Sequence, residues 1–341
     1  MSNVLGIDIG KNTIKLVSLS NDASKVVLEV IGEVKNPETD DKKEIDDKYL
    51  SNVGGAIKSL LNDFKIKDKQ VVVSLPESEV ISRLVRLPPL KDNEIMDALR
   101  FEAETFVPYS LDSVSIDYEI IEKDDAGRLT IFVIAAKNEI INNYIKLFKS
   151  IGLELVALES PAIALRRVLK LGMPTIERVV VMDIGERFSD VFIINKDNVY
   201  FDRALSVGGE SLTRAISLNL NLDMASAEEY KKAYGLRENE LEGKIRAAIL
   251  PVFNDISEEL RKTLALFSED IGKQAEVLVL SGGGANLPGL AEELTKILGI
   301  EVQILQPFVN IDTTKIKSTV NLVTEGCKFS LAVGLSLRGL I

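Results

Sequence analysis

An Asp-Ile-Gly tripeptide that begins at Asp8 lies between a short apolar run and a β-rich segment. Gly10 has no side chain, so the backbone N–H groups beside it can approach an oxyanion closely. Asn12 and Thr13 add short polar donors, and Lys15 adds a positive charge. Asp8 would repel a phosphate directly, but it can hold Mg²⁺ through water. This segment therefore has the chemistry to hold a polyphosphate together with Mg²⁺.

A second Asp-Ile-Gly follows about half a chain later and supplies Asp183, Gly185 and Ser189. Both segments are typical of a strand, a tight glycine turn and a second strand. Such repetition predicts two lobes built on one plan, with chance similarity of two common hairpins as the alternative. Two of these turns facing one another would clamp one polyphosphate and one Mg²⁺.

A third glycine-rich segment, SGGGANLPG, begins at Ser281 and is entered by an apolar run. Its three consecutive glycines leave an open backbone surface on which a flat base or a ribose can lie. A merely flexible turn is the alternative for this segment. The sequence contains no Walker A pattern, and no G-x-G-x-x-G follows a strand, so a nucleotide would be held in another way.

Composition excludes several classes of function. The chain has 341 residues, a net charge of −11 and no histidine. The length predicts two domains or one bilobed body. An acidic chain repels phosphate backbones, so we expect no nucleic-acid partner. Without histidine, a Ser-His-Asp triad and the classical zinc sites are excluded.

The cellular location is also constrained by the sequence. Cys327 is the only cysteine, so no intramolecular disulfide can form, which is typical of a reducing compartment. The N-terminal residues do not have the pattern of a signal peptide. No segment reaches the roughly 20 apolar residues that span a bilayer. We therefore expect a cytoplasmic protein that reaches the membrane only through partners.

Hydrophobic periodicity and turn residues predict a mixture of helices and strands. Helices are expected at 49–64, 92–106 with Asp92 as N-cap, 139–152, 161–169, 225–236, 247–267, 290–298 and in the last apolar segment. Strands are expected at 70–75, 114–122, 129–136 and 276–280. The order mixes βα units with hairpins and indicates an α/β fold with small added subdomains.

The combination of motifs resembles the actin-like superfamily and, in finer detail, the PilM family of type IV pilus assembly proteins. The similar segments are DIGKNTIKLV, LPPLKDNEIMDALRFEAETFVPYSLDSVSIDYEII, VALESPAIALRRV, VVVMDIG, SVGGESLTRAI, ISEELRKTLALF, LSGGGANLPGLAEEL and SLAVGLSLRG. Together they span nearly the whole chain. The segment 87–121 discriminates best, because generic members of the superfamily lack it.

The resemblance implies a two-lobed actin-like ATPase fold with duplicated core domains and inserted small subdomains. The core of lobe one would comprise 1–82 with 157–177 and 322–341, and an FtsA-type small subdomain would be inserted at 83–156. The core of lobe two would comprise 178–229 and 274–321, with a small helical subdomain at 230–273.

The resemblance also implies that ATP or ADP binds with Mg²⁺, which Asp8 and Asp183 would organise through water. The residues implied around the phosphates are Gly10, Lys11, Asn12, Thr13, Lys15, Gly185 and Ser189. Those implied around the nucleoside are Gly208, Gly209, Glu210, Arg261, Lys262, Gly282, Gly283 and Gly284. For Arg261 and Lys262, a solvated helix face is an equal alternative.

Three further residues bear on hydrolysis. Glu159 matches the glutamate that positions the attacking water in related ATPases, and the alternative is a glutamate that suits the dipole of the following helix. Lys11 and Glu186 stand where family members commonly have small residues. We hypothesise that this pair faces across the cleft, where a carboxylate near the triphosphate would disfavour hydrolysis. ATP binding with weak or no turnover is therefore expected.

The resemblance implies that the chain binds the N-terminal cytoplasmic peptide of a PilN-like membrane protein and contacts other pilus assembly components. The expected function is an ATP-loaded scaffold of type IV pilus assembly, or of a related type II secretion-like system. The alternatives are an FtsA-like cell-division protein, a small-molecule kinase of the same superfamily and a self-polymerising filament.

Overall fold

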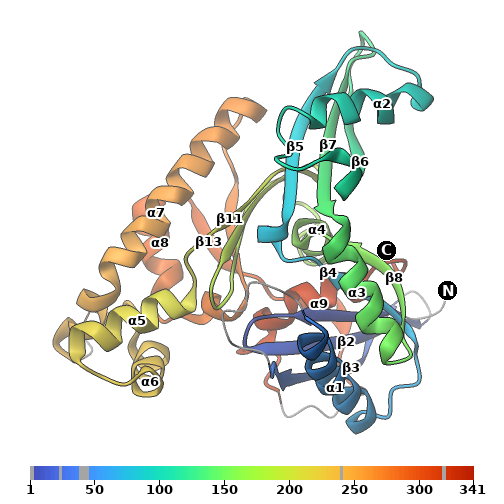
Figure 1. Ribbon diagram of the computed structural model, residues 1–341. Coiled ribbons are helices and arrows are strands. Elements are labelled where there is room, and N and C mark those ends of the chain that lie inside the picture. The colour runs from blue at the N-terminus through green and yellow to red at the C-terminus, as the bar shows by residue number, and fades with distance from the viewer. Residues whose placement is uncertain (1–3, 23–24, 38–45, 239–240, 317–319) are drawn as a thin grey trace.

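The computed structural model describes residues 4–22, 25–37, 46–238, 241–316 and 320–341. The chain forms two lobes, and a small subdomain extends from the first (Figure 1). Its sheets have six, five and three strands. The six- and five-stranded sheets form the cores of the lobes, and the three-stranded sheet forms the subdomain.

Lobe one is built on the six-stranded sheet, in the order β14-β3-β2-β1-β4-β8. Its strands are β1 (Leu5–Ile9), β2 (Thr13–Asp22), β3 (Lys25–Lys35), β4 (Gln70–Ser74), β8 (Glu154–Glu159) and β14 (Ile311–Asp312). Apolar residues on one face pack on α1 (Asp47–Asp63) and α3 (Asn138–Ser150). The other face packs on α4 (Pro161–Gly172) and α9 (Ser330–Ser336).

Lobe two repeats this plan in the order β11-β10-β9-β12-β13. Its strands are β9 (Arg178–Ile184), β10 (Ser189–Asn195), β11 (Asn198–Leu205), β12 (Val277–Ser281) and β13 (Glu301–Ile304). In each lobe the first three strands are antiparallel and the fourth runs parallel to the first. The outer face is covered by α5 (Gly209–Leu220), α6 (Met224–Tyr234), α7 (Lys244–Ile271) and α8 (Leu290–Leu298). The shared strand order accounts for the repeated Asp-Ile-Gly segments.

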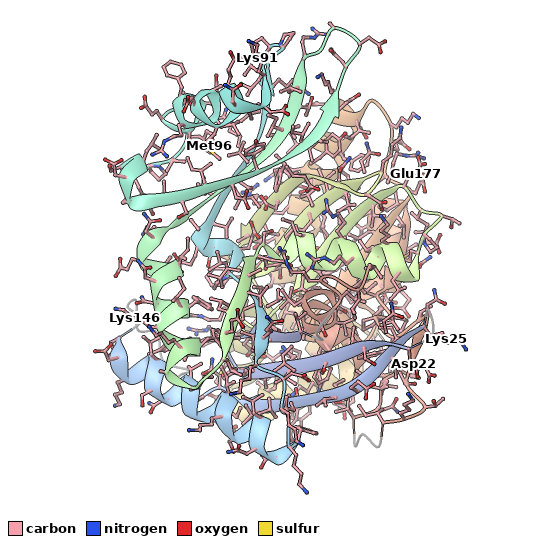
Figure 2. The ribbon with its side chains drawn as sticks, turned by 90° about the vertical axis from the view of Figure 1, so that its right-hand side faces the viewer. Asp22, Lys25, Lys91, Met96, Lys146 and Glu177 are labelled. Atoms are coloured by element: carbon pink, nitrogen blue, oxygen red, sulfur yellow. The ribbon has the colours of Figure 1, made fainter. Side chains whose placement is uncertain are left out.

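The inserted subdomain consists of an antiparallel sheet and one helix. The sheet has the order β5-β7-β6, with β5 (Val80–Leu87), β6 (Val114–Lys123) and β7 (Leu129–Lys137). Helix α2 (Asp92–Ala103) covers one face and buries Ile95 and Leu99 against it. Figure 2 shows α2 lying along this sheet, with Lys91 at its start.

The boundaries of the insertion differ from the expected 83–156. Strand β5 already begins at Val80, whereas α3 packs on α1 and β8 pairs with β4 in lobe one. The insertion therefore covers 80–137. The chain has also returned to lobe one by β14, which pairs with β3, so lobe two ends before the expected 321. An amphipathic helix or a short strand carries no sequence signal of which sheet it joins.

Some local expectations also need correction. Asp92 is the first residue of α2, and Lys91 is the N-cap, whose backbone N–H donates to the Glu94 carboxylate at 2.9 Å. Helix α7 is longer than expected at both ends. The last apolar segment divides into a 3₁₀ helix, η5 (Gly326–Phe329), and the short α9.

A continuous apolar layer joins the lobes. The inner faces of both large sheets pack on α4 and α9, which lie between them. The backbones approach closely here, because a Cβ on Gly6 would overlap the carbonyl of Ala332 and one on Gly334 would overlap the carbonyl of Ala164. Across the described ranges, no helix combines the length and the apolar character needed to cross a bilayer.

Candidate functional site

The two Asp-Ile-Gly turns have the same geometry. The backbone N–H of Gly10 donates to the carbonyl of Thr13 at 3.0 Å, and that of Gly185 donates to the carbonyl of Phe188 at 3.0 Å. In both turns a Cβ on the glycine would lie 2.9 Å from that carbonyl oxygen. A larger residue would therefore force the turn open, which explains glycine at both positions.

The side chains of Asp8 and Asp183 project from the inner faces of the two large sheets. Side chains alternate along a strand, so Asp183 shares its face with Val179 and Val181, which lie in the apolar layer between the lobes. By the same alternation, Asp8 shares its face with Gly6, which lies against α9. Each inner face thus changes from apolar to acidic where its first strand meets the glycine turn.

The charges of Asp8 and Lys15 both act on Asp183. Burial raises the pKa of Asp183 above its ordinary value, a hydrogen bond with Ser281 lowers it, the charge of Asp8 raises it and the charge of Lys15 lowers it. The ammonium of Lys15 lies 3.0 Å from Asp8 Oδ2. Among the described residues that act on Asp183, two carboxylates stand against the single ammonium group of Lys15, and a divalent cation would neutralise this excess of negative charge.

The donor set fits Mg²⁺ held mainly by water and phosphate. Magnesium usually takes one or two protein carboxylates and keeps several waters. No group of three or more ligating side chains occurs in the part of the chain that the structure describes. Asp8 and Asp183 fit an ion of this kind, and their role in holding Mg²⁺ through water stays a prediction.

The start of α5 is packed directly on the second turn. The N–H of Gly209 donates to the carbonyl of Gly185 at 2.9 Å, and the N–H of Glu210 donates to the carbonyl of Glu186 at 2.8 Å. A Cβ on Gly208 would lie 2.6 Å from the Glu186 carbonyl oxygen. This contact aims the positive end of the α5 dipole at the hairpin, where anionic groups are favoured.

The three glycines after β12 have different roles. Gly282 has a φ of +80°, and a Cβ there would lie 2.6 Å from the carbonyl oxygen of Ile184. A Cβ on Gly284 would overlap the Ile184 side chain. These two glycines let the 3₁₀ helix η4 (Gly283–Asn286) pack on β9. Gly283 has open space around its Cβ position, so it alone presents a free surface of the kind that the sequence predicts.

Several predicted residues are placed differently from expectation. The hydroxyl of Ser189 is buried and donates to the carbonyl of Val207 at 2.7 Å, so it braces the hairpin. Glu210 forms an ion pair with Arg214 at 2.7 Å on the surface of α5. Asn12 lies in the first turn, and Thr13 is the first residue of β2. The sequence did not single out Asn36, whose side-chain amide donates to the carbonyl of Gly10 at 2.9 Å.

Arg261 and Lys262 do not join the turns. Arg261 donates to the carbonyl of Ile297, at the end of α8 that is remote from the glycine segment, and Lys262 pairs with Glu259 at 2.8 Å. The solvated helix face is therefore the interpretation that fits. A different cation, Lys231 on α6, is buried and donates to the carbonyl of Gly209 at 3.0 Å. The sequence offered no signal for it beyond an ordinary charged helix.

Glu159 is held in a buried ion cluster. Arg167 contacts both of its carboxylate oxygens, at 2.8 and 2.6 Å, and Arg338 also donates to it. The Glu159 side chain is only 3% exposed. A carboxylate occupied by two guanidinium groups cannot orient a water molecule as well, so this geometry argues against the water-positioning role and against a surface glutamate.

The hypothesis of a pair between Lys11 and Glu186 stays a prediction. The Glu186 carboxylate lies 3.7 Å from the Cβ position of Gly209, within its own lobe. That position places the carboxylate beside the start of α5.

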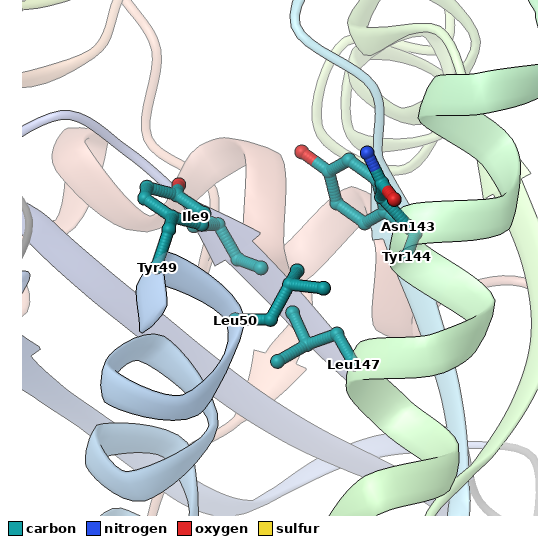
Figure 3. Close-up of a pocket in the computed structure, with 6 residues that line it drawn as sticks. All are labelled: Ile9, Tyr49, Leu50, Asn143, Tyr144 and Leu147. Carbon is teal, nitrogen blue, oxygen red and sulfur yellow. The ribbon is translucent and has the colours of Figure 1, made fainter. Parts of the chain in front are cut away.

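A small cavity borders the first turn. It has a volume of about 10 Å³, enough for one water molecule. Its walls are Ile9, Tyr49, Leu50, Asn143, Tyr144 and Leu147, which come from β1, α1 and α3 (Figure 3). Burial, and then the charges of Tyr49 and Asp8, raise the pKa of Tyr144. Its hydroxyl is therefore a neutral donor near Asp8.

The duplicated lobes and paired glycine turns define an actin-like protein. The fold is similar to MreB5 of Spiroplasma citri bound to ADP, with a TM-score of 0.57 at 13% identity over 100% of this chain and 97% of that one. A family model described as type IV pilus assembly protein PilM matches residues 6–340, so the chain belongs to the PilM family. The resemblance and the fold class predicted from the sequence are thus confirmed.

Two further similarities agree with this assignment. A solved PilM-PilN type IV pilus biogenesis complex contains a chain 28% identical to this one, with a TM-score of 0.86 over 100% of this chain and 99% of that chain. The cell division protein FtsA of Enterococcus hirae is 22% identical over 350 residues, which covers 89% of this chain and 78% of FtsA.

Proposed function

We propose that this protein is a nucleotide-binding scaffold of type IV pilus assembly that works in the cytoplasm and docks to a PilN-like membrane protein and other pilus components. The observation that carries the nucleotide part is the convergence of Asp8 and Asp183 from two identical turns. The family assignment and the similarity to the PilM-PilN complex support the assembly part.

In this proposal each turn serves one side of the polyphosphate. The turn from Gly10 to Thr13 and the turn at Gly185 offer backbone N–H groups, and Asp8 and Asp183 hold Mg²⁺ through water. Lys15 and the start of α5 add positive potential. Bound Mg²⁺ would supply charge neutralisation at the phosphates.

Slow or absent hydrolysis is proposed on two observations. The sequence has no histidine, and Glu159 is saturated by Arg167 and Arg338. A kinase of this fold would need a carboxylate that can reach a substrate hydroxyl. Because Arg167 and Arg338 already bind the Glu159 carboxylate, a scaffold is favoured over a kinase.

Calorimetry with Mg·ATP tests the nucleotide site. Asp8→Asn and Asp183→Asn should each weaken Mg·ATP binding by at least about tenfold, because each loses a charge that would face the metal. Asp63→Asn, at the exposed end of α1, should bind like the parent protein. Equal affinity in all four proteins would contradict the proposed site.

The partner peptide is proposed to dock in a groove on the inserted subdomain. This groove, of about 640 Å³, is lined by Asp97, Arg100, Phe101, Glu104, Val107, Tyr109, Ser110, Leu111 and Asp112. Phe101 is 72% exposed on α2, and Tyr109 is partly exposed. We refer to these nine residues as the α2 groove.

The charge of the α2 groove suits a segment that lies beside a membrane. Three of its residues are acidic and one is basic. Cytoplasmic segments next to a membrane span carry an excess of lysine and arginine. A short basic peptide with one apolar anchor would therefore complement both the carboxylates and the exposed Phe101.

Fluorescence anisotropy with the N-terminal cytoplasmic peptide of the PilN-like protein tests this groove. Phe101→Ala should weaken binding by roughly tenfold or more, the loss expected for a buried aromatic anchor. Leu218→Ala removes a side chain that is 76% exposed on α5 and should leave binding unchanged. Unchanged binding by Phe101→Ala would place the peptide elsewhere.

A further inference from the structure

A buried pair of carboxyl groups crosses from one lobe to the other. Glu77 begins the 3₁₀ helix η1 (Glu77–Glu79), between β4 and β5, and is only 5% exposed. Asp202 lies on β11, the edge strand of lobe two, and η1 packs against this strand. The two carboxyl groups lie close enough for one of them, once protonated, to donate to the other. The contact therefore exists only while η1 and β11 are together.

No cation compensates this pair within the described residues. The charged groups that act on Glu77 are Asp202 and Asp190, and the hydroxyl of Ser160 donates to Glu77 at 3.4 Å. Neither carboxylate oxygen of Asp202 has an amide, hydroxyl or ammonium partner from another described residue. Arg167 and Arg338 both contact Glu159, which pairs with Ser74 in the β4–β8 register.

Two ionised carboxylates cannot share such a site without strong repulsion. One proton between them converts the repulsion into a short O–H···O hydrogen bond. Burial, and then the charge of Asp202, raise the pKa of Glu77 well above its ordinary value. Burial raises the pKa of Asp202 to about 6. The pair therefore holds one proton up to a higher pH than either carboxyl group would in water.

We propose that Glu77 and Asp202 form a proton-dependent latch between the lobes. The pair takes up one proton when η1 meets β11, and the proton returns to water when the lobes separate and both groups ionise. Strand β11 also contacts β5 and β6 of the insertion, where Asn198 donates to the carbonyl of Ile121 at 3.3 Å. The latch thus fixes lobe two against the base of the inserted subdomain.

The sign of the pH dependence follows from the raised pKa values. A group whose pKa is higher in the latched state than in the separated state favours latching at low pH. That contribution is lost as the pH rises through the pKa of the latched pair. Asp190, which pairs with Asp183 in the β9–β10 register, acts in the same direction, because its charge also raises the pKa of Glu77. Glu79 is exposed on the same 3₁₀ turn and lies outside the pair.

Infrared spectroscopy detects the shared proton directly. The parent protein should show the absorption of a protonated carboxyl group at neutral pH. Glu77→Gln should lose the part of this absorption that the pair contributes, next to any contribution of Asp190, whose pKa is also raised by burial, and Glu79→Gln, two residues away, should keep the whole band. A spectrum of the parent without any such band, or one that Glu77→Gln leaves unchanged, overturns the proposal.

Distances between spin labels report the latch itself. Labels on Lys58→Cys of α1 and Glu229→Cys of α6 lie on exposed positions of opposite lobes (Figure 1). Between about pH 6 and pH 9, the separated population of the parent should grow by up to about tenfold per pH unit for one linked proton. Glu77→Gln should stay latched throughout, because the amide donates to Asp202 without a proton.

Asp202→Asn provides a second variant with the same expectation, since its amide can donate to Glu77. If the parent and both variants show the same pH response, the latch is refuted. Both readouts are made without nucleotide or partner. Their failure would therefore leave the proposed nucleotide site untouched, and failure of nucleotide binding would leave the latch untouched.

Discussion

Replacement of Glu159 should destabilise the protein far more than replacement of any exposed acidic residue. Its carboxylate is bound by Arg167 through two contacts and by Arg338, and it is almost fully buried. Removal of one partner of a buried ion pair leaves an uncompensated charge and costs about 3–5 kcal/mol. Glu159→Leu and Arg167→Leu should therefore each lower the free energy of unfolding by that amount.

The same contacts predict how much each of the other variants should lower the free energy of unfolding. The Arg338 side chain is 45% exposed, so Arg338→Leu should cost only about 1 kcal/mol. The double variant Glu159→Leu/Arg167→Leu removes both charges together, and the coupling between the two sites should reach about 1–3 kcal/mol. Denaturant unfolding of the parent, the three single variants and the double variant gives these free energies. Glu154→Gln, at the exposed start of β8, is the control.

Two results would refute this reasoning. The first is a cost below about 1 kcal/mol for Glu159→Leu, which would mean that the pair is solvated. The second is a stable Glu159→Gln variant that loses nucleotide hydrolysis present in the parent. That outcome would restore a catalytic role to Glu159 and would contradict its assignment to the ion cluster.

Three further predictions concern the glycines, the cysteine and the buried lysine. Gly208→Ala should lower the free energy of unfolding by about 1–3 kcal/mol, because its methyl group would meet the Glu186 backbone. Gly283→Ala should change the free energy of unfolding, measured by thermal unfolding, by less than about 0.5 kcal/mol. Burial raises the pKa of Cys327 from 9.0 to about 11, so its thiolate is roughly 100-fold scarcer at neutral pH. A disulfide reagent should therefore label the folded chain at least that much more slowly than the unfolded chain. Lys231→Met should cost about 2–3 kcal/mol in denaturant unfolding, because Glu228 and the carbonyl of Gly209 lose a buried cation.

The glycine turns were the most predictable part of this protein. Asp8 and Asp183 each follow an apolar run and precede a glycine that the turn requires, so local sequence determines both the hairpin and the position of its carboxylate. The repeat of the pattern then predicts the duplicated lobes. That the two aspartates converge on one Mg²⁺ stays a prediction, and it assumes that equivalent turns face each other.

Residues whose role depends on distant partners were not predictable. Ser189 looks like a phosphate ligand until Val207 is seen to accept its hydrogen bond. Glu159 looks free until Arg338, 179 positions later, reaches it. The same reason explains Glu77, whose neighbour Asp202 lies on the other lobe. Sequence patterns indicate the helix or strand to which a residue belongs, whereas the roles of these residues are set by contacts with a different helix or strand.

The path of the chain through the two lobes has a consequence for synthesis. Strands β9 to β13 and their helices form one uninterrupted stretch, so lobe two is complete in sequence once Ile304 has been made. At that point the sheet of lobe one still lacks β14, and the inner faces of both sheets still lack α9. On the ribosome the sheet and outer helices of lobe two can therefore fold first, whereas the apolar inner faces of both lobes stay partly uncovered until the last helix has emerged.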